Sequence, residues 1–221
     1  MEKLFLFLYR APWLTREEFG KRYLAEHAPL VLRHCPRLRR YVANVVENDV
    51  EGYDIALEFL VDTMADYDDP ARLYDSPDGQ AAAEAHRKEL TGRAIAYHVI
   101  EQVQLDHVQT WPDGERSPGQ KLLAPIARVD GLTHEQFAEH WTSTHSALAV
   151  QHLRGMGRYV TNVVDRALTD GAPEIDGIVE VHYTGKREFD SPEGQQALVE
   201  DTQSLLQTPV RSMAGEYILR S

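Results

Sequence analysis

The 221-residue sequence predicts an α+β protein in which one βαββαβ unit occurs twice and the two antiparallel sheets pack as a barrel. Two observations support this prediction. Residues 14–46 and 132–164 align without gaps, and thirteen of their 33 positions are identical, where average residue usage would give roughly two matches by chance. Residues 75–80 (DSPDGQ) then recur at 190–195 (DSPEGQ). Because two blocks recur in the same order, the chain is a tandem duplication.

Each copy opens with an apolar segment of strand length, at residues 3–9 and 121–129. A Thr followed three residues later by Glu or Gln, at Thr15 and Thr133, is typical of a capping box that satisfies the free amides of a helix start. Mostly apolar residues, with one histidine in each copy, then recur at positions i, i+4, i+8 and i+11, which form one buried helical face. This face comprises Phe19, Tyr23, His27 and Leu30 in copy one and Phe137, Trp141, His145 and Leu148 in copy two.

The remaining elements follow in the same order in both copies. The Ser-Pro pairs at 76–77 and 191–192 supply an N-cap and a first-turn proline for a second helix. The expected strands are bounded by turn residues and rich in β-branched side chains. They cover residues 40–47, 53–61 and 93–105 in copy one and residues 158–165, 175–183 and 211–219 in copy two.

Residues 106–119 are rich in Pro, Gly and charge, which is typical of a solvated connection. We therefore expect a first unit at 1–105, this linker, and a second unit at 120–221. A four-stranded sheet with both helices on one face leaves its other face bare, and two bare faces packed together form an eight-stranded barrel. Because fusion makes this pairing intramolecular, we expect an internal pseudo-dimer that is monomeric or a loose homo-oligomer.

Charge and composition exclude several classes of function. The chain has 35 acidic residues against 23 Lys and Arg, a net charge of −12, and this field repels nucleic acid and anionic membranes. No segment approaches the roughly 20 apolar residues that span a bilayer, and the single Cys35 excludes an intramolecular disulfide, so we expect a cytoplasmic protein. The sequence lacks a phosphate loop, a nucleophile elbow, a dinucleotide fingerprint and zinc-ligand spacing. We therefore expect no cofactor and no metal ligands.

The helix segment at 14–30, the strand start at 41–44 and the repeated DSPDG/DSPEG segment resemble the EthD family, which belongs to the dimeric α+β barrel (ferredoxin-like) superfamily. The resemblance covers both halves and leaves out only the linker. Family members are usually single-copy homodimers, so the fused form is unusual. Copy two departs from copy one after His145, where Ser-Ala replaces Ala-Pro, and in the turn before Arg158, where glycines replace proline. We therefore expect that the two pockets differ.

Two histidines and two tyrosines are the candidate catalytic residues. His27 and His145 lie within an otherwise apolar helix face, where an imidazole could act as general acid or base because its ordinary pKa is near neutrality. The alternative is a core histidine bonded to a backbone carbonyl. Tyr41 and Tyr159 lie on the second strand, and the resemblance to lactone isomerases of the superfamily implies a pocket tyrosine that donates to an oxyanion. The alternative is an aromatic ring that packs under the helix.

Further residues are candidates for substrate binding. Strand alternation places Asn44 and Asn162 on the face opposite the tyrosines, inside the barrel, where a structural role that ties the copies together is favoured. Tyr23 and Trp141 are expected to form pocket walls. The other candidates are Glu58, Glu180, His182 and His98, the last aligned with Glu216, whereas His86 and His140 are expected at the surface.

The resemblance and these residues favour a cofactor-independent enzyme of the lyase, isomerase or cyclase type. It would act by general acid–base chemistry on a small apolar carbonyl, lactone or aromatic polyketide-like compound in a dry pocket. Two alternatives stay open. The chain could be a non-catalytic accessory or small-molecule-binding protein of an oxidative degradation pathway, because EthD proteins accompany a cytochrome P450 system. It could also bind haem or act as a cofactor-free monooxygenase, because relatives in the wider superfamily use a histidine as haem ligand.

Overall fold

The computed structural model describes residues 1–48, 52–107, 111–207 and 211–221, so residues 108–110 of the expected linker lie outside the described residues. Copy one comprises β1 (Glu2–Arg10), α1 (Arg16–Arg22), the π-helical η1 (Tyr23–His27), α2 (Ala28–His34), β2 (Arg40–Val46), β3 (Ile55–Val61), α3 (Ala65–Asp68), α4 (Pro70–Leu73), α5 (Pro77–Leu90) and β4 (Thr91–Asp106). Copy two comprises β5 (Gln120–Ile126), α6 (His134–His140), the π-helical η2 (Trp141–His145), α7 (Ser146–His152), β6 (Leu153–Ala167), β7 (Gly177–Phe189), α8 (Pro192–Leu205) and β8 (Ser212–Arg220).

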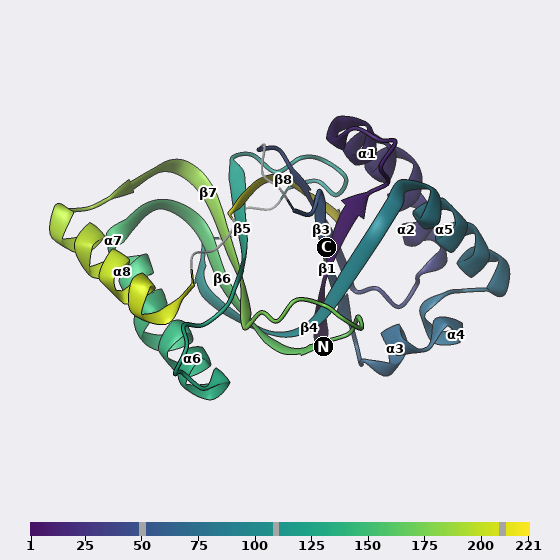
Figure 1. Ribbon diagram of the computed structural model, residues 1–221. Helices are drawn as coiled ribbons and strands as arrows, with labels where there is room; N and C mark the ends of the chain where they lie inside the picture. Colours follow the sequence, from purple (N-terminus) through teal and green to yellow (C-terminus); the bar gives the residue numbers. More distant parts are fainter. Residues whose placement is uncertain (49–51, 108–110, 208–210) are drawn as a thin grey trace.

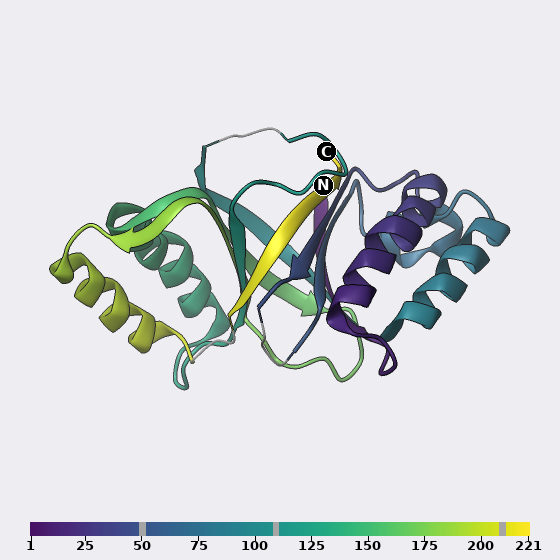
Figure 2. The ribbon, with the colours of Figure 1, turned by 90° about the horizontal axis from the view of Figure 1, so that it is seen from above.

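In the described part of the chain, eight antiparallel strands close into one barrel in the order β1-β3-β2-β8-β5-β7-β6-β4. Each copy supplies four neighbouring strands, and the copies join along two seams, β2 with β8 and β4 with β6. The helices of copy one and those of copy two cover opposite outer sides of the barrel (Figures 1 and 2). The structure therefore confirms the predicted α+β fold of two fused units whose sheets form an intramolecular barrel.

The predicted helix starts are present in both copies. The Thr15 hydroxyl accepts from the amide of Glu18 at 3.2 Å, and the Glu18 carboxylate accepts from the amide of Thr15 at 2.9 Å. Thr133 and Gln136 repeat this reciprocal pair at the same two distances. These capping boxes satisfy amides that the first turn of a helix leaves free.

The first helix of each copy differs from the regular α-helix that the sequence predicts. The π segments η1 and η2 interrupt it, and each contains a wider turn that shifts the side chains that follow it relative to an α-helical ladder. His27 and His145 are the last residues of these segments, and both are buried. Single π turns within α-helices occur frequently at functional sites.

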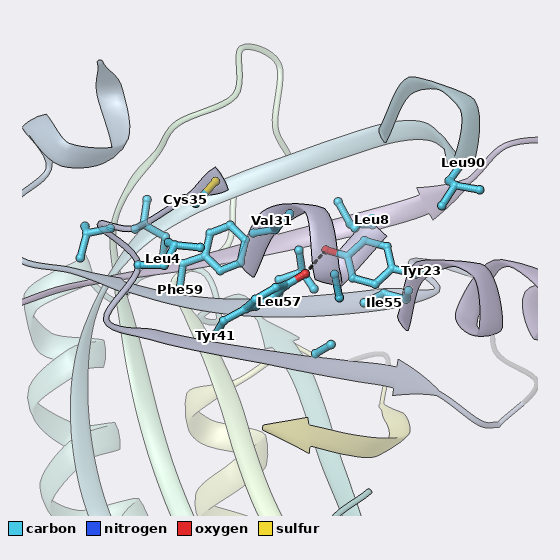
Figure 3. Packing of buried hydrophobic residues seen from close by; sticks show 14 of the residues in the cluster. Leu4, Leu8, Tyr23, Val31, Cys35, Tyr41, Ile55, Leu57, Phe59 and Leu90 are labelled. Atoms are coloured by element: carbon cyan, nitrogen blue, oxygen red, sulfur yellow. Dashed lines mark hydrogen bonds between the residues drawn. The ribbon is translucent and has the colours of Figure 1, made fainter. Parts of the chain in front are cut away.

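Alternation along the strands divides the apolar residues between three cores. In β1, Leu4 and Leu8 face the helices of copy one, where they pack with Tyr23 and Phe59 (Figure 3). Phe5 and Phe7, on the opposite face of the same strand, point into the barrel. Copy two has its own core between sheet and helices, and the barrel interior holds a third core. Each sheet is therefore covered on both faces.

The middle of the barrel holds buried charges that link the two copies. Lys3 of β1 and Lys121 of β5 occupy equivalent positions, and each is no more than 5% exposed. Glu58 lies 3.1 Å from Lys3 Nζ and 2.5 Å from Lys121 Nζ, and Glu180 lies 2.7 Å from Lys3 Nζ and 2.6 Å from Lys121 Nζ. Asn44 donates to Glu58 at 2.9 Å and Asn162 donates to Glu180 at 2.8 Å. We call these two lysines and two glutamates the ion ring.

Each lysine of the ion ring also contacts one further carboxylate. These contacts show that Glu216 corresponds to Glu101 of copy one, and not to His98 as the sequence alignment had it. Lys121 contacts Glu216 at 2.8 Å, and Lys3 contacts Glu101. Lys3 pairs with Val99 across the sheet and Lys121 pairs with Ala214, so the offset between the copies here is 115 and Glu101 is the counterpart of Glu216. His98 lies on the opposite strand face, where it contacts Glu2 at 2.8 Å and Asp165 at 2.9 Å.

We expect Lys121→Met to lower the free energy of unfolding by about 3–5 kcal/mol, because it leaves buried carboxylates without their cation. Urea denaturation followed by circular dichroism measures this change. The matched control is Lys21→Met, which removes only an exposed ion pair with Glu17 and should leave the urea midpoint unchanged. An unchanged midpoint for Lys121→Met would contradict a stabilising role for the ion ring.

The ion ring also predicts a loss of stability in acid. Burial alone would raise the pKa of the Glu58 carboxyl, but Lys121 and Lys3 hold it well below its usual range. A glutamate in the unfolded chain titrates near 4.3, so this contribution to stability is complete above about pH 4.3 and is lost as the pH falls toward the lower pKa of the folded state. The free energy of unfolding should therefore fall as the pH is lowered from about 4.3 to about 3, and less steeply in Glu58→Gln. Equal slopes for the two proteins would refute this assignment.

Candidate functional site

Each copy contains a cavity between its helix layer and its sheet. The copy-one cavity has a volume of about 250 Å³ and is lined by His27, and the copy-two cavity has a volume of about 110 Å³ and is lined by His145. Aliphatic and aromatic side chains form most of both walls. The duplicated histidines therefore mark duplicated cavities, but the groups around them differ.

In copy two, a carboxylate orients the histidine. Nδ1 of His145 lies 2.7 Å from one oxygen of Asp201, and Nε2 of His140 lies 2.7 Å from the other. Because an ionised carboxylate only accepts hydrogen bonds, Nδ1 of a neutral His145 carries the proton and Nε2 keeps the basic lone pair. Burial lowers the pKa of His145, and the hydrogen bond to Asp201 opposes this effect. The ring is therefore a neutral, oriented base at pH 7.

Tyr159 is also a lining residue of this cavity. Its hydroxyl receives a long contact of 3.4 Å from the Ser146 hydroxyl, which itself bonds to the Trp141 carbonyl at 2.6 Å. Burial raises the pKa of Tyr159 to about 12, so the phenol keeps its proton and can donate it in a hydrogen bond.

The glycine at position 177 makes room for the indole of Trp141, because a Cβ atom at Gly177 would lie 2.3 Å from the Trp141 ring.

In copy one, no carboxylate among the described residues bonds to the histidine. His27 stacks on His86, with ring centroids 5.6 Å apart and an interplanar angle of 7°. Its Nδ1 atom is buried and has no hydrogen-bond partner within the described ranges. Burial lowers the pKa of His27 to about 4, and His86 and Arg87 contribute in the same direction. The ring is therefore neutral at pH 7 but a much weaker base than a free imidazole.

The tyrosine of copy one does not reach its cavity. The hydroxyl groups of Tyr41 and Tyr23 lie 2.6 Å apart, and both side chains are at most 1% exposed (Figure 3). Tyr23 lines the cavity, whereas Tyr41 lies behind it and is not a lining residue. Copy two has Trp141 in place of Tyr23, so Tyr159 has no such phenol partner. The expected role of Tyr41 as a donor to substrate is thus not supported by its position.

The structure also identifies partners of the two histidines that the sequence analysis missed: His86 and His140 were expected at the surface, and Asp201 was not singled out. His86 packs against His27, and Asp201 and His140 form a hydrogen-bonded group with His145. His86 and Asp201 occupy the same position of the repeat, because the offset of 115 that relates the DSPDGQ and DSPEGQ blocks also relates residues 86 and 201. Extending that block along the second helix would have aligned them.

The remaining candidates lie away from both cavities. Glu58, Glu180, Asn44 and Asn162 belong to the centre of the barrel, where all four are at most 2% exposed. His182 lies at the barrel mouth, where its Nε2 atom is 2.7 Å from the Pro118 carbonyl and its Nδ1 atom is 3.3 Å from Glu216. The structure thus separates these residues from His27 and His145.

Both cavities are small. Both volumes lie below the 300–1,000 Å³ that is common for pockets of drug-sized ligands, so a haem does not fit without a rearrangement of the walls. Among the residues that the structure describes, no group of three or more His, Cys, Asp or Glu side chains could hold a metal ion.

The helices described here are also too short or too polar to cross a membrane.

We expect the two pocket histidines to respond in opposite directions when their partners are changed. His86→Ala should raise the pKa of His27 from about 4, because it removes a neighbouring imidazole and admits water. Asp201→Asn should lower the pKa of His145, because it removes the carboxylate that favours the protonated ring. NMR titration of the histidine Cε1–H signals measures both changes. Shifts of the same sign would contradict the assigned environments.

Solved structures with similar folds are distant in sequence. An anthrone oxidase-like protein has a TM-score of 0.61 and 12% identity, and the alignment covers 100% of this chain and 93% of that one. A monooxygenase-like protein from Lactobacillus acidophilus NCFM has a TM-score of 0.57 and 10% identity, with 99% and 96% covered. A variant chlorite dismutase from Candidatus Nitrospira defluvii, in complex with cyanide, has a TM-score of 0.53 and 13% identity, with 99% and 91% covered. These likenesses concern the fold alone.

No curated protein matches the sequence. The EthD domain, in contrast, matches it twice, at residues 11–94 and 129–207, and the two segments together make up more than half of the chain. Each segment contains the capped helix, the buried histidine and the second-strand tyrosine of one copy. The chain therefore belongs to the EthD family and carries two EthD domains in tandem.

Proposed function

We propose that this chain is a cofactor-independent enzyme that removes a proton from the carbon next to a carbonyl group of a small apolar compound. The observation that carries this proposal is that His145, oriented by Asp201, and Tyr159 both line one apolar cavity of copy two. A neutral imidazole supplies the base, and a protonated phenol supplies a hydrogen-bond donor. These are the two groups that enolisation requires.

The roles follow from the hydrogen bonds. Nε2 of His145 takes the proton from the carbon, the electron pair moves onto the carbonyl oxygen, and Tyr159 donates a hydrogen bond to the oxygen as it gains charge. Asp201 accepts from Nδ1 and stabilises the imidazolium that forms. Return of the proton to a different carbon gives an isomer, and loss of a leaving group from the next carbon gives a lyase product.

The walls and the size of the cavity indicate the substrate class. Leu122, Val181 and Leu198 are among the aliphatic residues around His145, and such walls exclude the water that would weaken these interactions. The volume of about 110 Å³ is less than the roughly 150 Å³ of a known apolar cavity that binds benzene. We infer a small ketone or lactone as substrate.

A monooxygenase-like activity would draw on the same site. A carbanion formed next to a carbonyl is the electron-rich species that a cofactor-free oxygenation needs, so proton removal by His145 would also be its first step. Two proteins of similar fold are described as monooxygenase-like and anthrone oxidase-like. Proton abstraction is thus the activity that both readings share, and it is the one to measure.

We expect the wild-type protein to accelerate the exchange of α-hydrogens for deuterium in a panel of small ketones and lactones dissolved in D₂O. Proton NMR follows this exchange without any cofactor. His145→Ala should lower the rate by about 10²–10⁴-fold, because the base is lost. Tyr159→Phe should lower it by about 10²-fold, because one donor to the oxyanion is lost.

The matched control is His27→Ala, which makes the same change at the same position of copy one. It should leave the exchange rate unchanged if the reaction occurs in copy two. Loss of exchange in His27→Ala with full activity in His145→Ala would transfer the reaction to copy one. Wild-type protein that exchanges no compound of the panel would favour a non-catalytic, small-molecule-binding role.

A further inference from the structure

The copy-one cavity has the size and walls to hold a substituted ring. Its volume of about 250 Å³ exceeds the roughly 150 Å³ of an apolar cavity that binds benzene. Leu6, Leu8, Leu57 and Phe59 of the sheet and Val31 of α2 form much of the wall. A ring of six carbons therefore fits against these residues and leaves room for a polar substituent.

A cation without an anionic partner lines this cavity. Arg87 of α5 is a lining residue, and within the described residues no carboxylate lies within ion-pair distance of its guanidinium group. Glu84 lines the cavity as well, but Gln80 donates to its carboxylate at 2.7 Å and Lys88 lies 4.0 Å from it on the same helix. The guanidinium of Arg87 is therefore available to a ligand.

One histidine and two further tyrosines of the cavity wall can also donate hydrogen bonds. His27 is 4% exposed, and its Nδ1 atom is buried without a partner in the described part of the chain. Leaving such an atom unpaired is costly, and in the tautomer that carries its proton on Nδ1 this nitrogen donates to a ligand oxygen. Tyr67 and Tyr74 line the same space, and burial raises the pKa of both phenols, so both keep their protons.

Copy two lacks these features at the equivalent positions. Thr202 replaces Arg87 and Val199 replaces Glu84 at the offset of 115. In copy two, β7 continues to Phe189, so no equivalent of the α3–α4 segment that carries Tyr67 is present there. The donor set around His27 therefore belongs to copy one alone and is separate from the acid–base groups of copy two.

We propose that the copy-one cavity is a binding site for a small ring-containing carboxylate, whose ring packs on Leu57 and Phe59 and whose carboxylate binds Arg87 and His27. The guanidinium of Arg87 supplies a positive charge and hydrogen-bond donors, and His27 supplies a further donor. Together they match the negative charge and the two acceptor oxygens of a carboxylate. No carboxylate within the described ranges supports His27 as a base, so the role we assign to this site is binding. This inference is independent of the reaction assigned to copy two.

Isothermal titration calorimetry with sodium benzoate tests the proposal on the full chain. We expect benzoate to bind the wild-type protein with a Kd of about 1 mM or below, and benzamide, which has the same shape but no charge, to bind about tenfold more weakly. Arg87→Gln should weaken benzoate binding by about tenfold or more. Because the benzamide comparison uses only wild-type protein, it does not depend on the folding of a variant.

The matched control is Arg187→Gln, which removes an exposed arginine that lines the copy-two cavity and should leave benzoate binding unchanged. Binding that survives Arg87→Gln but is lost in Arg187→Gln would place the benzoate in copy two and overturn the proposal. Equal affinities for benzoate and benzamide, or no binding of either, would overturn it as well. Deuterium exchange by copy two is measured separately, so either proposal can fail alone.

Discussion

The ion ring at the centre of the barrel is the constraint on which the rest of the structure depends. Lys3 and Lys121 each contact both Glu58 and Glu180, so every lysine of the ring bonds to a carboxylate of its own copy and to one of the other. Taking these charges out of water is costly unless each finds its partners. The two sheets are therefore held in one relative position, in which all four ionised groups are paired.

Because the inner faces of the sheets are committed to this ring and to the apolar core beside it, the cavities lie on the outer faces, under the helices. Each copy then has its own site, and the two sites do not share residues of the barrel interior. Duplication within one chain also removes the symmetry that a homodimer imposes. One site can change while the other is kept.

The two copies differ at the partner of the helix histidine that both of them contain. Asp201 in copy two orients His145 as a base, whereas His86 in the same position of copy one stacks on His27 and disfavours its protonation. The second-strand tyrosines also have different neighbours: the hydroxyl of Tyr41 lies 2.6 Å from that of Tyr23, whereas copy two has Trp141, which carries no hydroxyl, in place of Tyr23. A few substitutions therefore separate an acid–base site from a site suited to binding.

Much of the fold could be predicted from the sequence, because the repeat, the capping boxes and the strand patterns are local signals. The ion ring could not, because Lys3 and Lys121 stand near the ends of short strands and only closure of the barrel buries them. The partners His86 and Asp201 were missed because the offset between the copies changes from 118 to 122 and then to 115 along the chain. The π turns were missed because no residue pattern marks them.

The most direct test of the divergence between the copies is the protonation of the pocket histidines at pH 7, measured from two-bond ¹H–¹⁵N correlations of the imidazole rings. We predict that His145 is neutral, with the proton on Nδ1 and a lone pair on Nε2, because Asp201 accepts from Nδ1. That result would establish an oriented base in copy two. A His145 ring protonated on Nε2 alone, or on both nitrogens, would leave Nε2 without a lone pair and would contradict the acid–base role.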